Sequence, residues 1–136
     1  MSLRSIPSIV LAFILYNAIV FISGTTEVLN HALFELPMLS GGTWRFEVGD
    51  LIILVTLFLL FAELIKATYT STSSLVDHGL SMVVFIACLV EFLLAPLAAT
   101  STFFLVMVAT AIDVVAGFTI GIRVARRDLA IGGGLD

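Results

Sequence analysis

The chain alternates between long apolar stretches and shorter polar ones. The apolar stretches cover approximately residues 6–24, 48–67, 79–96 and 101–122. Because roughly 20 apolar residues in a helix cross the hydrocarbon core of a bilayer, each stretch is predicted to be a membrane span. The short alternating segments typical of outer-membrane barrels are missing. The pattern therefore predicts an all-α integral membrane bundle of four transmembrane helices, formed by a single domain over residues 1–136.

The last two predicted spans are separated only by a short break. Pro96 opens it, and a run of small and hydroxyl residues from Ala98 to Thr102 follows. Proline disfavours continuation of a helix, and serine or threonine side chains cap the start of a new one. This break predicts a tight helical hairpin at one face of the membrane.

The longest polar stretch, residues 25–47, separates the first two spans. Its apolar residues recur at helical spacing: Val28, Leu29, Ala32, Leu33 and Leu36. This spacing predicts a short amphipathic helix on the membrane surface, ended by Pro37 and a Gly41–Gly42 turn. Trp44 and Phe46 follow where interfacial aromatic residues are expected, so we predict that they are interfacial anchors.

Composition and charge exclude several other classes of protein. Apolar residues make up 60% of the chain and charged residues 12%, against about 25% charged in soluble domains; the mean hydropathy is +1.21. A net charge of −4 with a single small basic cluster, Arg123, Arg126 and Arg127, argues against nucleic-acid binding. The single cysteine, Cys88, excludes an intramolecular disulfide and a cysteine-based zinc site.

The basic residues predict an orientation. With the N-terminus inside, five of the six basic residues lie on the cytoplasmic side: Arg4, Lys66, Arg123, Arg126 and Arg127. Only Arg45 lies outside. Residues 6–24 are interpreted as an uncleaved span, since Ile22, Ser23 and Gly24 make a poor signal-peptide cleavage site. We therefore expect a bacterial inner-membrane protein with cytoplasmic N- and C-termini, an outer loop over residues 25–47 and a cytoplasmic tail over residues 123–136.

Ionisable residues within hydrocarbon are costly and are candidates for function. The candidates here are Glu63, Glu91 and Asp113, with Asn17 as a polar companion and Lys66 three residues after Glu63. Counted at about 1.5 Å per residue, Asn17, Glu91 and Asp113 lie roughly 13–18 Å from the inner face and are expected to share one layer. Glu63 and Lys66 share a helix face, which predicts an ion pair near the inner interface.

Two interpretations of Glu91 and Asp113 stay open at this stage. Two acids in a low dielectric cannot both ionise cheaply, so a shared layer suits a proton-coupled transporter or a cation pathway. The alternative is that each acid is protonated or hydrogen-bonded and holds helices together. Asp113 is predicted to be protonated or paired at neutral pH, with Asn17 and Glu91 as its nearest partners in depth, and to matter more for function than Glu63.

A stripe of small residues surrounds Asp113 on the last span. Ala109, Asp113, Gly117 and Gly121 recur every four residues, and Gly117-x-x-x-Gly121 allows another helix to approach closely. The stripe is therefore predicted to be a helix-packing seam. Its partner helix belongs either to the same chain or to a second copy.

One face of the third span carries Ser81, Cys88, Glu91 and Ala95, and this face is predicted to point inward. His78 lies beside Asp77 at the inner edge. A haem bound by two histidines would need His31 as well, which lies on the opposite side of the membrane. We therefore predict no cofactor and no metal. Because the sequence has no nucleotide-binding glycine loop and no catalytic triad, an enzyme is not predicted.

The run from Leu57 to Tyr69, with Glu63 and Lys66 in it, resembles the second span of the phosphate-starvation-inducible PsiE-like membrane proteins. The Thr26-Glu27-Val28 segment and the run Val83–Leu94 are similar too, although Glu91 stands where the family has an arginine. The resemblance implies a small bacterial inner-membrane protein linked to stress, and supplies no catalytic residues.

We therefore expect a non-catalytic interaction or accessory subunit, with the lipid bilayer and either further copies of itself or a larger membrane complex as partners. The alternatives are a small oligomeric channel or proton-coupled transporter, and an anchor subunit of a respiratory or photosynthetic complex.

Overall fold

The computed structural model describes residues 6–69 and 74–133. Within these ranges the chain forms four α-helices: α1 (Val10–Ser23), α2 (Val48–Tyr69), α3 (Ser74–Leu94) and α4 (Ser101–Gly133). Two short 3-10 helices, η2 (Thr26–Asn30) and η3 (Pro96–Ala98), and two strands, β1 (Ala32–Pro37) and β2 (Thr43–Glu47), complete the described part. Arg4 and residues 134–136 lie outside it.

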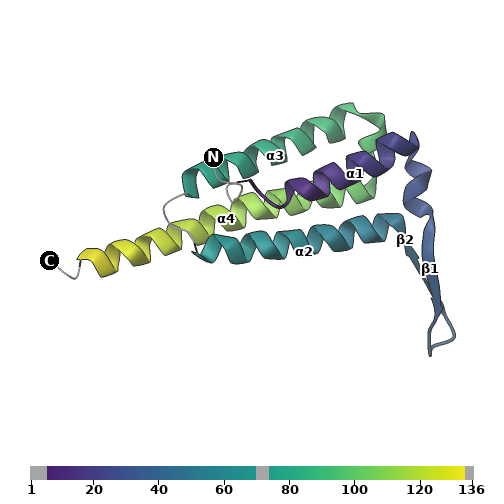
Figure 1. The fold of residues 1–136 in the computed structure, drawn as a ribbon, viewed down its shortest axis with the longest axis horizontal. Helices are drawn as coiled ribbons and strands as arrows, with labels where there is room; N and C mark the ends of the chain where they lie inside the picture. The colour runs from purple at the N-terminus through teal and green to yellow at the C-terminus, as the bar shows by residue number, and fades with distance from the viewer. Residues whose placement is uncertain (1–5, 70–73, 134–136) are drawn as a thin grey trace.

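The helices lie side by side, with α4 packed against both α2 and α3, and α1 covering part of the seam between them (Figure 1). The β-strands project from one end, which we call the hairpin end and define by residues 24–47 and 95–100. The last part of α4 extends beyond the other helices at the opposite end (Figure 1).

Three of the helices are long and apolar enough to cross a membrane: Val48–Tyr69, Val76–Leu94 and Ser101–Arg123. These correspond closely to the predicted spans over residues 48–67, 79–96 and 101–122. α1 has 14 residues, about 21 Å at 1.5 Å per residue, and is shorter than the roughly 30 Å of a hydrocarbon core. The described residues thus form a helical bundle in which three helices are long and apolar enough to span a membrane.

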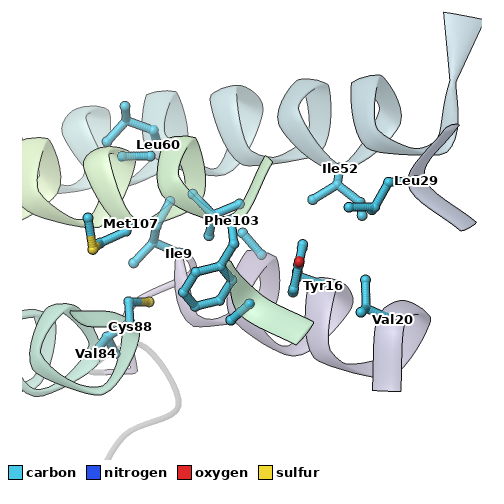
Figure 2. Close-up of a cluster of buried hydrophobic side chains, with 14 of the residues drawn as sticks. Ile9, Tyr16, Val20, Leu29, Ile52, Leu60, Val84, Cys88, Phe103 and Met107 are labelled. Atoms are coloured by element: carbon cyan, nitrogen blue, oxygen red, sulfur yellow. The ribbon is translucent and has the colours of Figure 1, made fainter. Parts of the chain in front are cut away.

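The core of the bundle lies where the four helices meet. Phe103 of α4 and Tyr16 of α1 are fully buried, and their ring centroids lie 4.9 Å apart, edge to face. Figure 2 shows these rings among the aliphatic side chains of the same cluster. Burial of such large side chains in close contact stabilises the association of helices in lipid, where packing is the main attractive force.

The predicted turn between the last two spans is confirmed. Pro96 begins η3, and the Thr100 hydroxyl oxygen accepts a hydrogen bond from the Phe103 N–H at 3.1 Å, which caps the start of α4. The hydroxyl of Tyr16 donates to the carbonyl of Leu97 at 2.7 Å and lies 2.8 Å from Thr100 Oγ1. The turn therefore also fixes α1 to the hairpin end.

The predicted amphipathic surface helix in residues 25–47 is wrong. Only η2 is helical there; β1 and β2 pair antiparallel, with Phe34 opposite Phe46, Leu36 opposite Trp44 and Glu35 opposite Arg45. Gly41, at a φ of 91°, provides the left-handed conformation that reverses the chain. Once the chain is reversed, cross-strand side-chain pairs and main-chain hydrogen bonds stabilise the two strands.

α4 continues beyond the predicted end of its span at residue 122. The helix runs through Arg123 and on to Gly133, so the described part of the predicted tail is helical. Arg123, Arg126 and Arg127 are exposed on it.

Candidate functional site

The intramembrane polar residues form two separate groups. Asn17 and Glu91 meet toward the hairpin end, where Asn17 Nδ2 donates to Glu91 Oε2 at 3.1 Å and to the Phe13 carbonyl at 2.9 Å. Asp113 lies elsewhere, 12 residues into α4 from Ser101, about 18 Å along the helix. Because α3 and α4 run in opposite directions from the turn, Glu91 near that turn cannot lie level with Asp113. The predicted single layer of Asn17, Glu91 and Asp113 is therefore wrong.

Asp113 instead belongs to a polar group that we call the Asp113 cluster, from three helices. Its members line one small cavity: Glu63 and Lys66 of α2, Asp77, His78 and Ser81 of α3, and Asp113 of α4. The cavity has a volume of about 20 Å³, which is enough for a single water molecule, since one needs about 10–15 Å³. Buried polar groups from separate spans thus converge around a space the size of a water.

Glu63 and Lys66 form the predicted ion pair, with Lys66 Nζ 3.6 Å from Glu63 Oε1. Both also bind the backbone that precedes α1: Glu63 accepts a hydrogen bond from the Ser8 N–H, and Lys66 donates to the Ile6 carbonyl at 3.3 Å. The backbone around Pro7 is not helical, and polar groups of non-helical backbone at membrane depth need partners. The pair therefore has a structural task that the sequence pattern did not indicate.

Asp113 is the most deeply buried acid of the cluster. Its side chain is 4% exposed, and within the described residues its Oδ2 atom has no hydrogen-bond partner. Ser81, Glu63 and Lys66 are the groups that act on it electrostatically. An ionised carboxylate without full compensation is costly in an apolar environment. The described protein groups therefore compensate a negative charge on Asp113 only in part.

His78 lies against the glycines of α4. A Cβ atom at Gly121 would be 2.7 Å from His78 Nε2, and one at Gly117 would be 3.0 Å from His78 Nδ1. The imidazole also lies 4.6 Å from the Phe118 ring. Ala109, Gly117 and Gly121 are all buried. Within this chain, Gly117 and Gly121 therefore pack α4 against His78 of α3.

His78 also has a buried polar atom, Nε2, which faces Gly121. Its Nε2 is buried and has no hydrogen-bond partner among residues 6–69 and 74–133. Ser81, whose hydroxyl donates to the Asp77 carbonyl at 3.1 Å, is 5% exposed. The inward face predicted for the third span is confirmed by Ser81 and by Cys88, which is fully buried. His78 was expected at the inner edge of the third span, without a link to Asp113. Gly117 and Gly121, one turn apart on α4, were the sequence signal that a bulky side chain of a neighbouring helix packs there.

In the described part of the chain, no three His, Cys, Asp or Glu side chains gather at one point where they could hold a metal ion. The chemistry of the Asp113 cluster is that of carboxyl, imidazole, hydroxyl and ammonium groups around a water-sized space. Such groups accept, donate and exchange protons.

Comparisons with protein-family models, with curated proteins and with solved structures found no match to this chain. The resemblance to PsiE-like proteins therefore stays a prediction, and arguments about function depend on the geometry of the Asp113 cluster.

Proposed function

We propose that this chain is a small multi-span membrane protein that works by taking up and releasing a proton at Asp113, as a proton-coupled transporter or proton channel does. The observation that carries the proposal is the unpartnered Oδ2 of a carboxyl group that is only 4% exposed. In a membrane interior such a group needs a proton or a partner of opposite charge. Its state therefore depends on proton supply.

The rest of the cluster supports a variable charge at Asp113 rather than at Glu63. Glu63 has Lys66 at 3.6 Å and the Ser8 N–H as fixed partners. With that pair mutually neutralised, Asp113 has no dedicated cation of its own. A proton is the smallest group that can compensate it inside a cavity of about 20 Å³.

His78 is the second participant that we propose. His78 and Asp113 line the same cavity, and the His78 Nδ1 atom lies beside Gly117, one helical turn from Asp113, whereas Nε2 faces Gly121. Water in that cavity would let a proton move from the carboxyl group to Nδ1 of the imidazole, giving a carboxylate and an imidazolium. The summed charge of the two groups is the same before and after transfer, so the step does not add net charge to the membrane interior.

We also propose that α1 completes a four-span arrangement in a bacterial inner membrane, with both termini in the cytoplasm. α1 alone is too short, but residues 6–9 precede it, and their backbone polar groups reach Glu63 and Lys66. Lys66, Arg123, Arg126 and Arg127 lie toward the opposite end from Arg45, and cytoplasmic loops carry the excess of basic residues. In this topology the Asp113 cluster is nearer to the cytoplasm.

The test uses the full chain in liposomes that contain a pH-sensitive dye, with a proton gradient imposed. We expect proton flux for the unmodified protein and its loss for Asp113→Asn, which keeps the shape and hydrogen-bonding capacity of the side chain but cannot titrate. Asp50→Asn is the matched control, because Asp50 is an exposed acid in the first turn of α2, outside the Asp113 cluster. Glu91→Gln should reduce flux less than Asp113→Asn, since Glu91 has Asn17 as a partner.

A second measurement keeps the proposal independent of transport conditions. Infrared difference spectra between acidic and alkaline buffer should contain a protonated-carboxyl band that Asp113→Asn removes and Asp50→Asn retains. Equal flux in the unmodified protein, in Asp113→Asn and in empty liposomes, together with an unchanged infrared band, would contradict the proposal. An accessory role in a larger membrane complex would then be favoured.

A further inference from the structure

The hairpin formed by β1 and β2 has two chemically different faces. Side chains alternate between the faces of a strand, and the register pairs Phe34 with Phe46, Leu36 with Trp44 and Glu35 with Arg45. We call the side with Phe34, Leu36, Trp44 and Phe46 the aromatic face. On it the Phe34 ring stacks on Phe46 at 4.9 Å and meets Trp44 edge-on at 5.5 Å.

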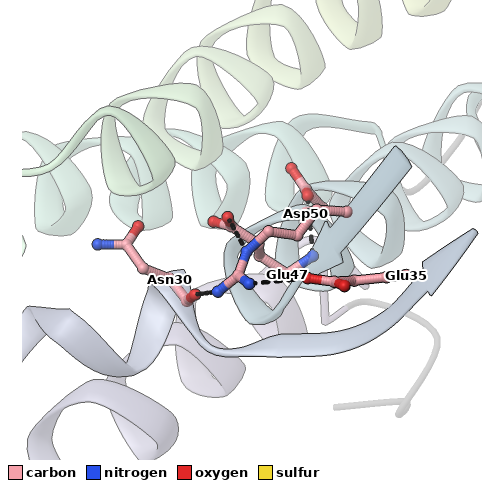
Figure 3. A network of polar contacts seen from close by, with 5 residues as sticks. Asn30, Glu35, Glu47 and Asp50 are labelled. Atoms are coloured by element: carbon pink, nitrogen blue, oxygen red, sulfur yellow. Dashed lines mark hydrogen bonds and ion pairs between the residues drawn. The ribbon is translucent and has the colours of Figure 1, made fainter. Parts of the chain in front are cut away.

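The opposite side of the hairpin is polar and internally satisfied. Arg45 donates to Glu35 at 3.1 Å, to Glu47 at 3.0 Å and to the Asn30 carbonyl at 2.8 Å, as Figure 3 shows. The hydrogen bonds to Glu47 and Glu35 raise the pKa of the Arg45 guanidinium above its ordinary value, so Arg45 stays charged at physiological pH.

The polar side of the hairpin also faces the neighbouring loops of the hairpin end. Glu47 lines a polar pocket with Asn30, Asp50, Thr100 and Ser101, residues of the loops and helix starts at this end of the bundle. Because Glu47 and Arg45 are on the same side of β2, the aromatic face is turned away from these polar loops.

No described part of the bundle covers the aromatic face. Phe34, Leu36 and Trp44 remain 46–47% exposed, and at the tip Met38 and Leu39 are exposed as well. The hairpin leaves the bundle across the direction of the helices and extends past α2 (Figure 1). Side chains of α2 such as Phe58 and Phe61 are exposed and apolar, as expected for a helix surface that contacts lipid.

We infer that the hairpin lies on the bilayer surface with its aromatic face seated in the boundary between lipid headgroups and acyl chains. Tryptophan and other aromatic side chains favour this boundary, and an element with one apolar and one charged side lies in the plane of the interface. The orientation of the polar side toward the polar loops and of the aromatic side away from them matches this placement. The inference depends on the membrane spans and not on the proton-binding proposal.

Trp44 tests the inference directly because it is the only tryptophan of the chain. The full chain is placed in vesicles of phosphatidylcholine and phosphatidylglycerol, and Trp44 fluorescence is recorded. We expect blue-shifted emission, strong quenching by lipids brominated near the headgroup end of the acyl chain, and weak quenching by aqueous iodide. Emission typical of water with strong iodide quenching would overturn the inference. Blue-shifted emission that brominated lipid does not quench, and that changes with the protein-to-lipid ratio, would overturn it in favour of contact between copies.

A pair of variants separates the two faces. Leu36→Glu places a charge on the aromatic face and should shift Trp44 emission to the red, with increased iodide quenching. Glu35→Gln changes the neighbouring residue on the polar side and should leave the emission and both kinds of quenching unchanged. If the two variants gave equal Trp44 spectra, whether both were shifted or both were unchanged, the assignment of the faces would be contradicted.

Discussion

The charged groups of the hairpin and those of the Asp113 cluster exist under opposite physical conditions. The Arg45 side chain is 49% exposed and bonded to three partners, whereas Asp113 is 4% exposed and has an oxygen that no described residue satisfies. In water, hydration compensates a charge whether or not an ion pair forms. Inside a bundle only the protein, a proton or a trapped water can do so. The hairpin charges should therefore be replaceable, and those of the cluster should not.

The largest effect is expected where His78 packs most closely against α4. Gly121→Leu would place side-chain atoms where His78 now lies, 2.7 Å from the position of a Cβ, and we expect it to destabilise the fold by about 2–3 kcal/mol. Gly79→Leu is the matched control, because a Cβ at Gly79 meets nothing within 4 Å. Unfolding in mild detergent measures both.

The native mass in the same detergent should be unchanged by Gly121→Leu, since the seam lies within one chain. A change in oligomeric mass with stability retained would mean that the glycines serve contact between copies instead.

An intermediate effect is expected from removing the partner of Lys66. Glu63→Ala leaves the ammonium group and the Ser8 N–H without their acceptor, and an unsatisfied buried polar group costs about 1–3 kcal/mol. We expect a loss of about 2 kcal/mol in the free energy of unfolding. Glu35→Ala removes an exposed acid on the hairpin and serves as the comparison. Similar losses for the two variants would refute the contrast between the regions.

The smallest effect is expected from Arg45→Gln. This variant removes three hydrogen bonds of an exposed side chain, and water replaces them. We expect a melting temperature within measurement error of the unmodified protein, at both low and high salt. A decrease in melting temperature as large as that of Glu63→Ala would show that the hydrogen bonds of Arg45 contribute substantially to the stability of the fold.

The long helices were predictable because length and apolarity decide them. α2 begins at Val48 as predicted, and α4 begins at Ser101 after the predicted turn. The hairpin was missed because Val28, Leu29 and Ala32 match a helical period. The better signal was the strict alternation in Thr43–Glu47, where Trp44 and Phe46 alternate with polar residues, next to a Gly41–Gly42 turn.

Several polar residues of the candidate site were predictable from the sequence, but not which of them lie together. The Glu63–Lys66 pair follows from spacing within one helix, and the structure confirms it. The partners of Asp113 depend on how α2, α3 and α4 are aligned along their length. Depth counting from a span start at residue 79 placed Glu91 level with Asp113, whereas α3 begins at Ser74, so that Glu91 lies about 26 Å and Ser81 about 10 Å along it. Only the turn at Pro96 and the packing of His78 on Gly117 fix that alignment.

The length of α4 has a mechanical consequence. α4 is one uninterrupted helix of 33 residues, and its glycines pack against His78 as far as Gly121. The part after Gly121 is about 18 Å long at 1.5 Å per residue, and a tilt of this part by about 10° would displace its end by about 3 Å. A small change in the packing between His78 and Gly121 would therefore move the exposed residues Arg123, Arg126 and Arg127, which lie beyond it.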